Sequence, residues 1–218
     1  MTGDRHDDTG AVLDDLSDLG HRFDGHSLPE FITELLIWNP QLGLVSKGDT
    51  AAVVARLIRQ SVDFWDVIAA VNPGAPIRRV ADVGSGAGFP GVIWKLVNPD
   101  LEITLIERKE RRAVYLERLR RKLSLSGIDV VDEDVREIVA RGRYRGAFDL
   151  VAMLAVAPPA EVAATVETLL PEGGLFGSFR SGRNRALEQV VGRHLVLAGS
   201  RATPAGKFLV YQKATPSQ

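Results

Sequence analysis

The stretch Asp82-Val-Gly84-Ser-Gly86-Ala-Gly88-Phe-Pro-Gly91 decides the fold, because it follows an apolar run and opens a predicted helix. Glycines at this spacing allow a tight turn with positive φ, and they let a ligand approach the backbone where no Cβ stands in the way. Asp82 ends the preceding strand directly before the glycines. A carboxylate there repels a pyrophosphate but can hold an ammonium group, such as that of S-adenosylmethionine. The loop therefore predicts a site for S-adenosylmethionine that includes Asp82, Gly84, Ser85, Gly86 and Gly88.

Two other interpretations of the same glycines stay open. Gly86, Gly88 and Gly91 also satisfy the G-x-G-x-x-G pattern, and Glu107 follows Gly86 by 21 residues, as in sites for nicotinamide or flavin dinucleotides. The second alternative is a turn that is rich in glycine for structural reasons alone and binds no ligand. The first glycine after the strand is Gly84, however, which gives the tighter G-x-G-x-G spacing of methyltransferases and favours S-adenosylmethionine.

Outward from the loop, short apolar runs alternate with helical stretches after residue 74, which indicates βαβ units around a parallel sheet. Residues 195–198 and 207–213 predict two strands of a closing hairpin, where a plain dinucleotide fold continues with a parallel strand. The predicted fold is a class I S-adenosylmethionine-dependent methyltransferase (Rossmann-like) α/β sheet, mostly parallel with a C-terminal antiparallel hairpin. The other predicted elements are strands at 77–83, 101–107, 130–131, 148–154 and 173–179, and helices at 90–97, 109–125 and 159–170.

Helical patterns precede the sheet. Ser27-Leu-Pro-Glu30 is a capping box with proline in the first turn, and it predicts a helix that Asn39-Pro40 ends. A longer amphipathic helix begins at Thr50. We expect residues 27–74 to form a helical cap on a methyltransferase domain of residues 75–218, the two as one compact unit. The acidic residues 1–26 are predicted to be a flexible segment.

The net charge of −1 conceals an uneven distribution. Residues 1–34 hold nine acidic and two basic residues, a balance of −7, so the remainder carries +6. A basic excess raises the chance that this part meets a polyanion, although it is also common on ordinary solvated surfaces. The chain has no cysteine, which excludes disulfides, thiolate zinc sites and a cysteine nucleophile. No uncharged stretch exceeds 12 residues and the N-terminus is acidic, so we expect a cytoplasmic protein that does not enter a membrane.

Acidic residues also follow the next two predicted strands. Glu107 ends the second, where a carboxylate can accept hydrogen bonds from both ribose hydroxyls of a nucleoside cofactor, although it could instead cap the following helix. Asp134 follows the third, where a carboxylate can take the exocyclic amine of adenine while the amide of Val135 reaches N1. Asp132 and Glu133 are alternatives to Asp134 in that role.

Several segments together resemble the RsmG (glucose-inhibited division protein B) family, whose members methylate a guanine N7 in small-subunit ribosomal RNA. These are Glu34-Leu-Leu-Ile-Trp38-Asn39, the glycine loop with its Phe-Pro-Gly tail, Glu107-Arg-Lys-Glu-Arg-Arg-Ala-Val-Tyr-Leu116 and Phe208-Leu-Val-Tyr-Gln-Lys213. The resemblance implies S-adenosylmethionine as cofactor, guanine N7 of 16S ribosomal RNA as acceptor, and ribosomal RNA or the small ribosomal subunit as partner. It also implies that Phe89, Val135 and Arg136 contact the cofactor together with Gly84. The full predicted set is Asp82, Gly84, Ser85, Gly86, Gly88, Phe89, Glu107, Arg108, Asp134, Val135 and Arg136.

The polar substrate face departs from the family pattern. Met153-Leu154-Ala155 stands where the family has Ser-Arg-Ala, and Leu57-Ile-Arg-Gln60-Ser61 stands where it has His-x-x-Asp-Ser. A methyltransferase for a small molecule and a non-enzymatic scaffold that binds the cofactor therefore stay open as alternatives.

The candidate substrate-binding residues are Leu154 and three arginines. Arg180, Arg183 and Arg185 follow the fifth predicted strand near the carboxyl edge of the sheet, and guanidinium groups can grip phosphates or stack on a base. We name no catalytic acid or base, because N7 of guanine carries a free lone pair and no proton must leave before it attacks. The sequence predicts no metal site.

Overall fold

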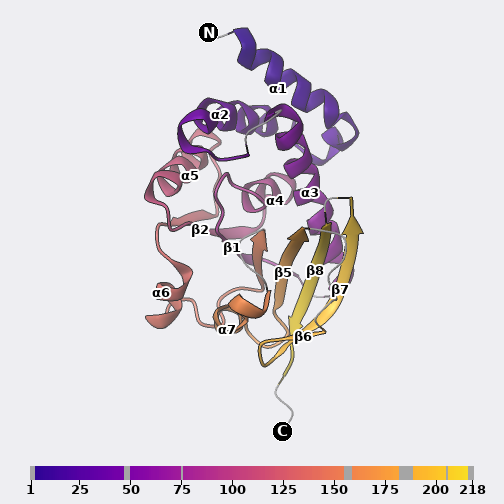
Figure 1. Ribbon diagram of the computed structural model, residues 1–218, viewed down its shortest axis with the longest axis vertical. Helices are drawn as coiled ribbons and strands as arrows, with labels where there is room; N and C mark the ends of the chain where they lie inside the picture. Colours follow the sequence, from indigo (N-terminus) through magenta and orange to yellow (C-terminus); the bar gives the residue numbers. More distant parts are fainter. Residues whose placement is uncertain are drawn as a thin grey trace.

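The computed structural model describes residues 3–46, 50–74, 76–154, 159–181, 189–204 and 206–215, and it contains one sheet with helices on both faces (Figure 1). The strands are β1 (Arg79–Val83), β2 (Glu102–Ile106), β3 (Ile128–Val131), β4 (Leu150–Leu154), β5 (Leu175–Ser181), β6 (Val190–Val191), β7 (Leu195–Thr203) and β8 (Gly206–Lys213). The helices are α1 (Gly3–Asp15), the 3-10 helix η1 (Ser17–Arg22), α2 (Ser27–Leu42), α3 (Thr50–Val71), α4 (Gly91–Val97), α5 (Glu110–Lys122), α6 (Val135–Ala140) and α7 (Pro159–Leu169). Among the described residues, no helix is both long and apolar enough to cross a bilayer.

The strand order β3-β2-β1-β4-β5-β8-β7-β6 confirms the predicted fold. β1 to β5 are parallel, whereas β8 is antiparallel to both β5 and β7. The dinucleotide fold has a parallel sixth strand beside the fifth, so the antiparallel β8 distinguishes the two folds. β7 extends well beyond the predicted residues 195–198, because it pairs with β8 as far as Thr203. The two-residue β6 and the short α6 were not predicted.

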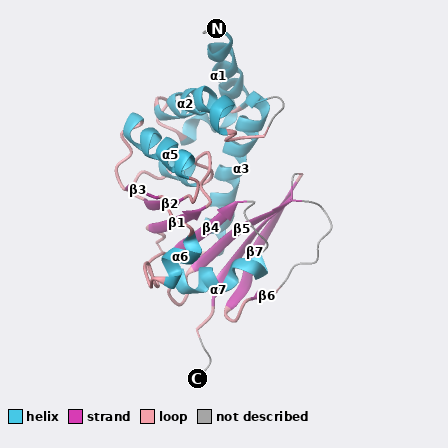
Figure 2. Cartoon of the chain, turned by 60° about the vertical axis from the view of Figure 1, so that its left-hand side comes forward, coloured by secondary structure: helices cyan, strands magenta, loops and turns pink. Residues whose placement is uncertain are grey.

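Alternate residues of the central strands pack on opposite faces of the sheet, because successive side chains of a strand point to opposite sides. On β4, Leu150 and Ala152 belong to the core that includes α2, α3, α4 and α5, whereas Val151 and Met153 belong to the core with α6 and α7. Figure 2 shows α3 and α5 on one side of the sheet and α6 and α7 on the other. Burial on both faces explains why the parallel strands are continuous apolar runs in the sequence.

Helix α3 packs against the sheet through aromatic side chains. Phe64 stacks on Phe208 of β8 with 4.7 Å between ring centroids, and Nε1 of Trp94 in α4 donates a hydrogen bond to the carbonyl of Ser61 at 2.7 Å. Gly177 of β5 makes room for Phe64, since a Cβ at that glycine would lie 2.7 Å from Cζ of the ring. The helical segment before β1 is therefore part of the same core as the sheet.

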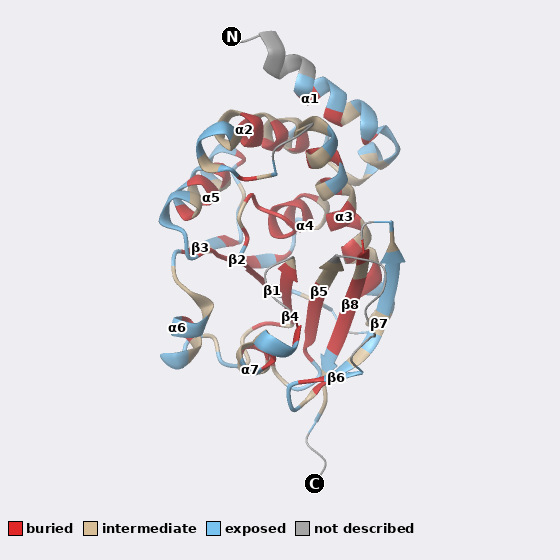
Figure 3. Ribbon diagram, viewed as in Figure 1, coloured by how far each residue is buried: buried red, intermediate tan, exposed pale blue. Residues whose placement is uncertain are grey.

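The acidic N-terminal segment is docked on α3. Val12 of α1 is fully buried, and Figure 3 shows buried residues among exposed ones along this helix. The segment and α3 each supply an arginine and a carboxylate: Arg22 pairs with Asp66 at 3.0 Å, and Arg59 pairs with Asp18 at 2.7 Å. The described part of this segment, from Gly3 on, is thus largely helical and held by partners from a helix about 40 residues further along the chain, whereas the acidic sequence alone predicted flexibility.

Helix α2 begins at Ser27, as predicted, but it ends later than predicted. Just before the helix, Oδ1 of Asp24 accepts a hydrogen bond from the backbone N–H of Ser27 at 2.8 Å. Asn39-Pro40 does not end the helix. The missing N–H of proline removes only one hydrogen bond, and the helix continues for two more residues. The helix ends before Gly43, which takes the left-handed conformation with φ of 55°.

Candidate functional site

A cavity of about 590 Å³ lies at the carboxyl ends of β1, β2 and β3. In open α/β sheets, ligands bind at this edge, beside the point where the strand order reverses, and here the order reverses between β1 and β4. The volume falls in the range of ligand pockets, roughly 300–1,000 Å³. The wall is formed by the glycine loop, the ends of the strands, the first turns of α5 and α7, and Leu44 and Leu57 of the helical cap.

The glycine loop has the backbone that the sequence predicted. Gly86 and Gly88 have φ values of 54° and 94°, a region in which other residues are strained. A Cβ on Gly88 would lie 2.8 Å from a methyl group of Val92, whereas the nearest atom to a Cβ on Gly86 would be 3.7 Å away. Gly88 therefore packs inward against α4, whereas at Gly86, which lines the cavity, a Cβ would meet other atoms only at ordinary contact distance. The N–H of Gly84 donates to the carbonyl of Ile106 at 2.7 Å, which ties the loop to β2.

Asp82 lies beneath the loop and does not line the cavity. It is 1% exposed, its Oδ2 accepts a hydrogen bond from the N–H of Gly91 at 3.1 Å, and its Oδ1 has no partner among the described residues. Burial, with a smaller contribution from the nearby Glu107 carboxylate, raises the pKa of Asp82 to about 7. The sequence led us to expect Asp82 to face an ammonium group, but in the structure it holds the start of α4 against the end of β1.

The raised pKa of Asp82 makes stability depend on pH. The folded protein keeps the Asp82 proton up to about pH 7, whereas the unfolded chain releases it near pH 3.8. The contribution of Asp82 to stability is therefore fully present below the unfolded pKa of 3.8 and is lost as the pH rises through about 7. The difference between the unfolded and folded pKa values corresponds to a change of at most about 4 kcal/mol in the free energy of unfolding. We expect the free energy of unfolding of the parent protein to fall by roughly 2–3 kcal/mol more between about pH 5 and pH 8 than that of Asp82→Asn.

Urea unfolding followed by circular dichroism at several pH values measures this difference. Asp82→Asn keeps an oxygen for the Gly91 N–H but has no charge to bury. Asp100→Asn, at an exposed position, is the matched control and should follow the parent curve. Parallel curves for the parent and Asp82→Asn would contradict the prediction.

Glu107 lies at the end of β2 with its carboxylate against the glycine loop. The residue is 5% exposed, and its two oxygens accept hydrogen bonds from the N–H groups of Gly86 at 3.0 Å and Lys109 at 2.9 Å. The side chain therefore both supports the loop and caps the start of α5. Each carboxylate oxygen has a further lone pair, and Glu107 lines the cavity, so it can also accept bonds from two hydroxyl groups of a ligand.

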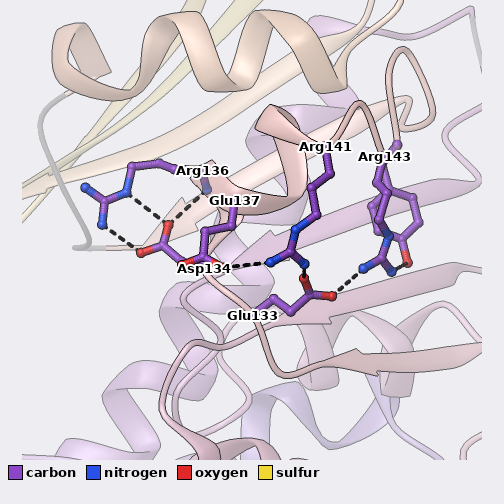
Figure 4. Close-up of polar contacts among 7 residues, drawn as sticks. Glu133, Asp134, Arg136, Glu137, Arg141 and Arg143 are labelled. Atoms are coloured by element: carbon purple, nitrogen blue, oxygen red, sulfur yellow. Dashed lines mark hydrogen bonds and ion pairs between the residues drawn. The ribbon is translucent and has the colours of Figure 1, made fainter.

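Asp134 and Glu133 lie at the end of β3, where arginines hold both carboxylates (Figure 4). Asp134 caps α6 through the backbone N–H of Arg136 and forms two bonds with the Arg136 guanidinium, at 3.0 and 2.7 Å. The hydrogen bonds from this guanidinium hold the pKa of Asp134 at about 2. Glu133 is paired with Arg141 and Arg143. An adenine amine at Asp134 would therefore have to share the carboxylate with Arg136.

The structure brings most of the predicted cofactor-binding residues to one wall. Asp82 and Gly88 lie behind that wall, and the exposed Asp132 does not line it. The contacts themselves stay a prediction. The predicted residues that line the cavity are Gly84, Ser85, Gly86, Phe89, Glu107, Arg108, Asp134, Val135 and Arg136.

The predicted substrate-binding residues do not gather in the same way. Leu154 lines the cavity, whereas Arg180 does not. Arg180 lies within β5 opposite Lys207, because pairing with β8 extends the strand past the residue at which we expected it to end. Arg183 and Arg185 lie outside the described residues.

Sequence reasoning missed several residues of the cavity wall, among them Glu161, Val162 and Thr165 of α7. Leu44 and Leu57 come from the helical cap, and Arg112 comes from the first turn of α5. A signal for Arg112 exists in the sequence, because side chains on a helix point back toward its N-terminus. An arginine at the start of the helix after β2 is thereby directed toward the carboxyl edge of the sheet.

The described residues fit S-adenosylmethionine. Gly86 brings side-chain-free backbone to the cavity wall, Glu107 offers acceptors for hydroxyl groups, and Ile106, Val135 and Leu154 offer apolar contact to a base or a methyl group. Within the described ranges, no group of three or more histidine and acidic side chains is placed to hold a metal ion.

Comparison with known proteins gives a consistent picture. A family model described as GidB, rRNA small subunit methyltransferase G, matches residues 25–197. The ribosomal RNA small subunit methyltransferase G of Roseiflexus castenholzii is 31% identical over 177 residues, which are 80% of this chain and 72% of that protein. The proteins of the same name from Caldanaerobacter subterraneus and Sorangium cellulosum are 29% and 28% identical, and the matches cover 74% and 86% of this chain and 64% and 79% of theirs.

Solved structures of low sequence identity share the fold. A putative methyltransferase from Escherichia coli superposes with a TM-score of 0.55 at 16% identity, covering 72% of this chain and 84% of that one. A variant of MtNAS in complex with S-adenosylmethionine superposes with a TM-score of 0.60 at 14% identity, covering 84% and 73%.

Proposed function

Since the chain belongs to the GidB family of small-subunit ribosomal RNA methyltransferases, we propose that it methylates N7 of a guanine in 16S ribosomal RNA. It is an S-adenosylmethionine-dependent methyltransferase, as its family is. The observation that carries the proposal is the cavity at the carboxyl edge, which brings together the glycine loop, Glu107, and Leu44 and Leu57 of the cap.

The residues of the cavity can support this reaction by binding and orientation alone. The bound cofactor supplies an electrophilic methyl group on a sulfonium. The glycine loop and Glu107 would fix the cofactor, while Leu57 and Leu154 exclude water beside it. N7 of guanine has a lone pair that points away from the ring, so no proton is removed and no general base is needed. Rate enhancement then comes from holding the lone pair in line with the methyl group, and from electrostatic fit.

One observation favours a second candidate, a methyltransferase for a small molecule. Leu44, Leu57 and Leu154 give the cavity wall an apolar surface, against which a methyl acceptor could lie. Such a surface suits a small aromatic or aliphatic acceptor as well as the face of a base.

Transfer of labelled methyl groups tests the proposal. The purified protein would be incubated with labelled S-adenosylmethionine and either naked 16S ribosomal RNA or whole small subunits from cells that lack the gene. We expect label in one of the two, and chemical cleavage at 7-methylguanosine should show a single new site. Absence of label from both, with S-adenosylmethionine bound normally, would reject the RNA assignment and leave the small-molecule candidate.

A further inference from the structure

Arg112 joins the helical cap to the glycine loop across the cavity. Its NH2 group donates a hydrogen bond to the carbonyl of Gly43 at 2.7 Å. Its NH1 group lies 3.8 Å from the point that a Cβ on Gly86 would occupy, so the guanidinium lies beside the glycine loop. The side chain is half-buried and lines the cavity. A guanidinium has five N–H donors, and the bond to Gly43 uses one of them.

The other cations of the cavity are placed differently. Arg136 forms two bonds with Asp134, and Arg108 lies 3.7 Å from the same carboxylate, so both belong to the β3 end. Lys109 is exposed where α5 begins. Arg112 donates to the neutral carbonyl of Gly43, which satisfies a donor but does not neutralise the charge. Arg112 therefore brings positive charge to the glycine-loop end of the cavity.

The cavity has two ends of different chemistry, and S-adenosylmethionine has two arms. If the ribose binds at Glu107, the purine would extend toward Val135 and the carboxylates that follow β3, and the amino-acid arm would extend along the glycine loop. That arm ends in a carboxylate, for which a guanidinium is the best-matched partner. We propose that Arg112 binds the carboxylate of the cofactor's amino-acid arm while it holds Gly43, so that it fastens the helical cap over the bound cofactor. The inference rests on the proposed function, because it takes S-adenosylmethionine as the ligand.

The loop that Arg112 holds is built to carry a contact to the cavity. Gly43 ends α2 in the left-handed conformation, and the N–H of Val45 donates to Oδ1 of Asn39 at 2.9 Å. Between these two anchors lies Leu44, which lines the cavity. By holding Gly43, Arg112 thus helps to position Leu44 in the cavity wall, and the same guanidinium would bind the cofactor.

Two ligands that differ only in the carboxylate test the proposal. Isothermal titration calorimetry would compare S-adenosylmethionine with decarboxylated S-adenosylmethionine, which keeps the ammonium and the sulfonium. For Arg112→Ala we expect the affinity for S-adenosylmethionine to fall by about 10- to 100-fold and that for the decarboxylated ligand to change by less than about threefold. Arg112→Lys, which keeps the charge without the planar fork, should lose less.

Two neighbours on the same segment complete the test: Arg111 as a matched control and Lys109 as the rival cation. Arg111→Ala removes an exposed arginine that does not line the cavity and should leave both affinities unchanged. Equal weakening of both ligands by Arg112→Ala, with a lower melting temperature, would show that Arg112 only supports the cap and would overturn the proposal. A carboxylate-specific loss in Lys109→Ala but not in Arg112→Ala would also overturn it. If the parent protein binds neither ligand, the cofactor assignment itself fails.

Discussion

Replacing Glu107 with alanine is expected to weaken the binding of S-adenosylmethionine by at least about 100-fold. The carboxylate would accept two ribose hydroxyls, and hydrogen bonds to a charged group contribute about 1.5–3 kcal/mol each. The change also leaves the N–H groups of Gly86 and Lys109 without their acceptor, so the glycine loop loses its support from β2. Both effects act on the same ligand, which is why this substitution should be among the most damaging to binding.

Calorimetric titration measures the effect, and two further variants make it interpretable. Glu107→Gln keeps one acceptor oxygen of similar shape, so we expect a smaller loss, on the order of 10-fold, with a normal melting curve. Glu102→Ala lies on the same strand at its exposed opposite end and should bind as the parent does. An alanine variant that is folded and binds within about threefold of the parent would show that Glu107 only caps α5.

The sheet and its glycine loop could be predicted because their signals are local. The run of buried residues on β4, for example, is apolar on both faces, so it reads as a parallel strand without knowledge of its neighbours. The loop at Gly84–Gly91 carries its own backbone requirement, which glycines at fixed positions reveal. The closing hairpin follows from the turn region before Gly206 and the apolar strand after it.

The docking of the N-terminus could not be predicted in the same way. Residues 1–26 are acidic, and acidity alone is typical of a solvated segment. What holds them is a set of partners on α3, such as Arg59 for Asp18 and Asp66 for Arg22, and these pairings exist only once the chain is folded. The six-residue α6 was missed for a related reason: Ile138 is its single buried residue, so there is little apolar periodicity to detect.

The residues of the site also fall into those that local sequence signals predict and those that depend on the folded chain. Side chains at strand ends, such as Glu107 and Asp134, could be placed because the carboxyl ends of parallel strands meet at one edge. Leu44 reaches the cavity only because the cap packs over α5, and the bond from Arg112 to the Gly43 carbonyl depends on the same packing, which the sequence does not show. Arg180 was expected to follow the fifth strand but lies within β5, because the length of β5 depends on its pairing with β8, a strand about 30 residues later.

Replacing Gly91 with alanine is expected to destabilise the protein by about 3 kcal/mol, with a fall in melting temperature of roughly 6–12 °C. A Cβ at Gly91 would lie 2.6 Å from Cδ2 of Leu105 and 2.7 Å from Oδ2 of Asp82. Both atoms are in the closely packed layer between α4 and the sheet, so the helix must move away from β1 and β2. That movement also breaks the hydrogen bond from the Gly91 N–H to Asp82 and leaves a buried carboxylate without its donor.

Gly10→Ala is the matched control, because Gly10 also lies in a helix but a Cβ there would meet no atom within 4 Å. Alanine at that position should stabilise the protein by roughly 0.5–1 kcal/mol, through its better helix propensity. The two glycine substitutions are therefore expected to have opposite signs in the same urea titration. Since the glycine loop runs directly into α4, Gly91→Ala should also lower the affinity for S-adenosylmethionine, although Gly91 itself does not line the cavity. A loss of less than about 0.5 kcal/mol would mean that Leu105 and Asp82 move aside at little cost, and that the layer beneath the loop is packed less closely than these distances require.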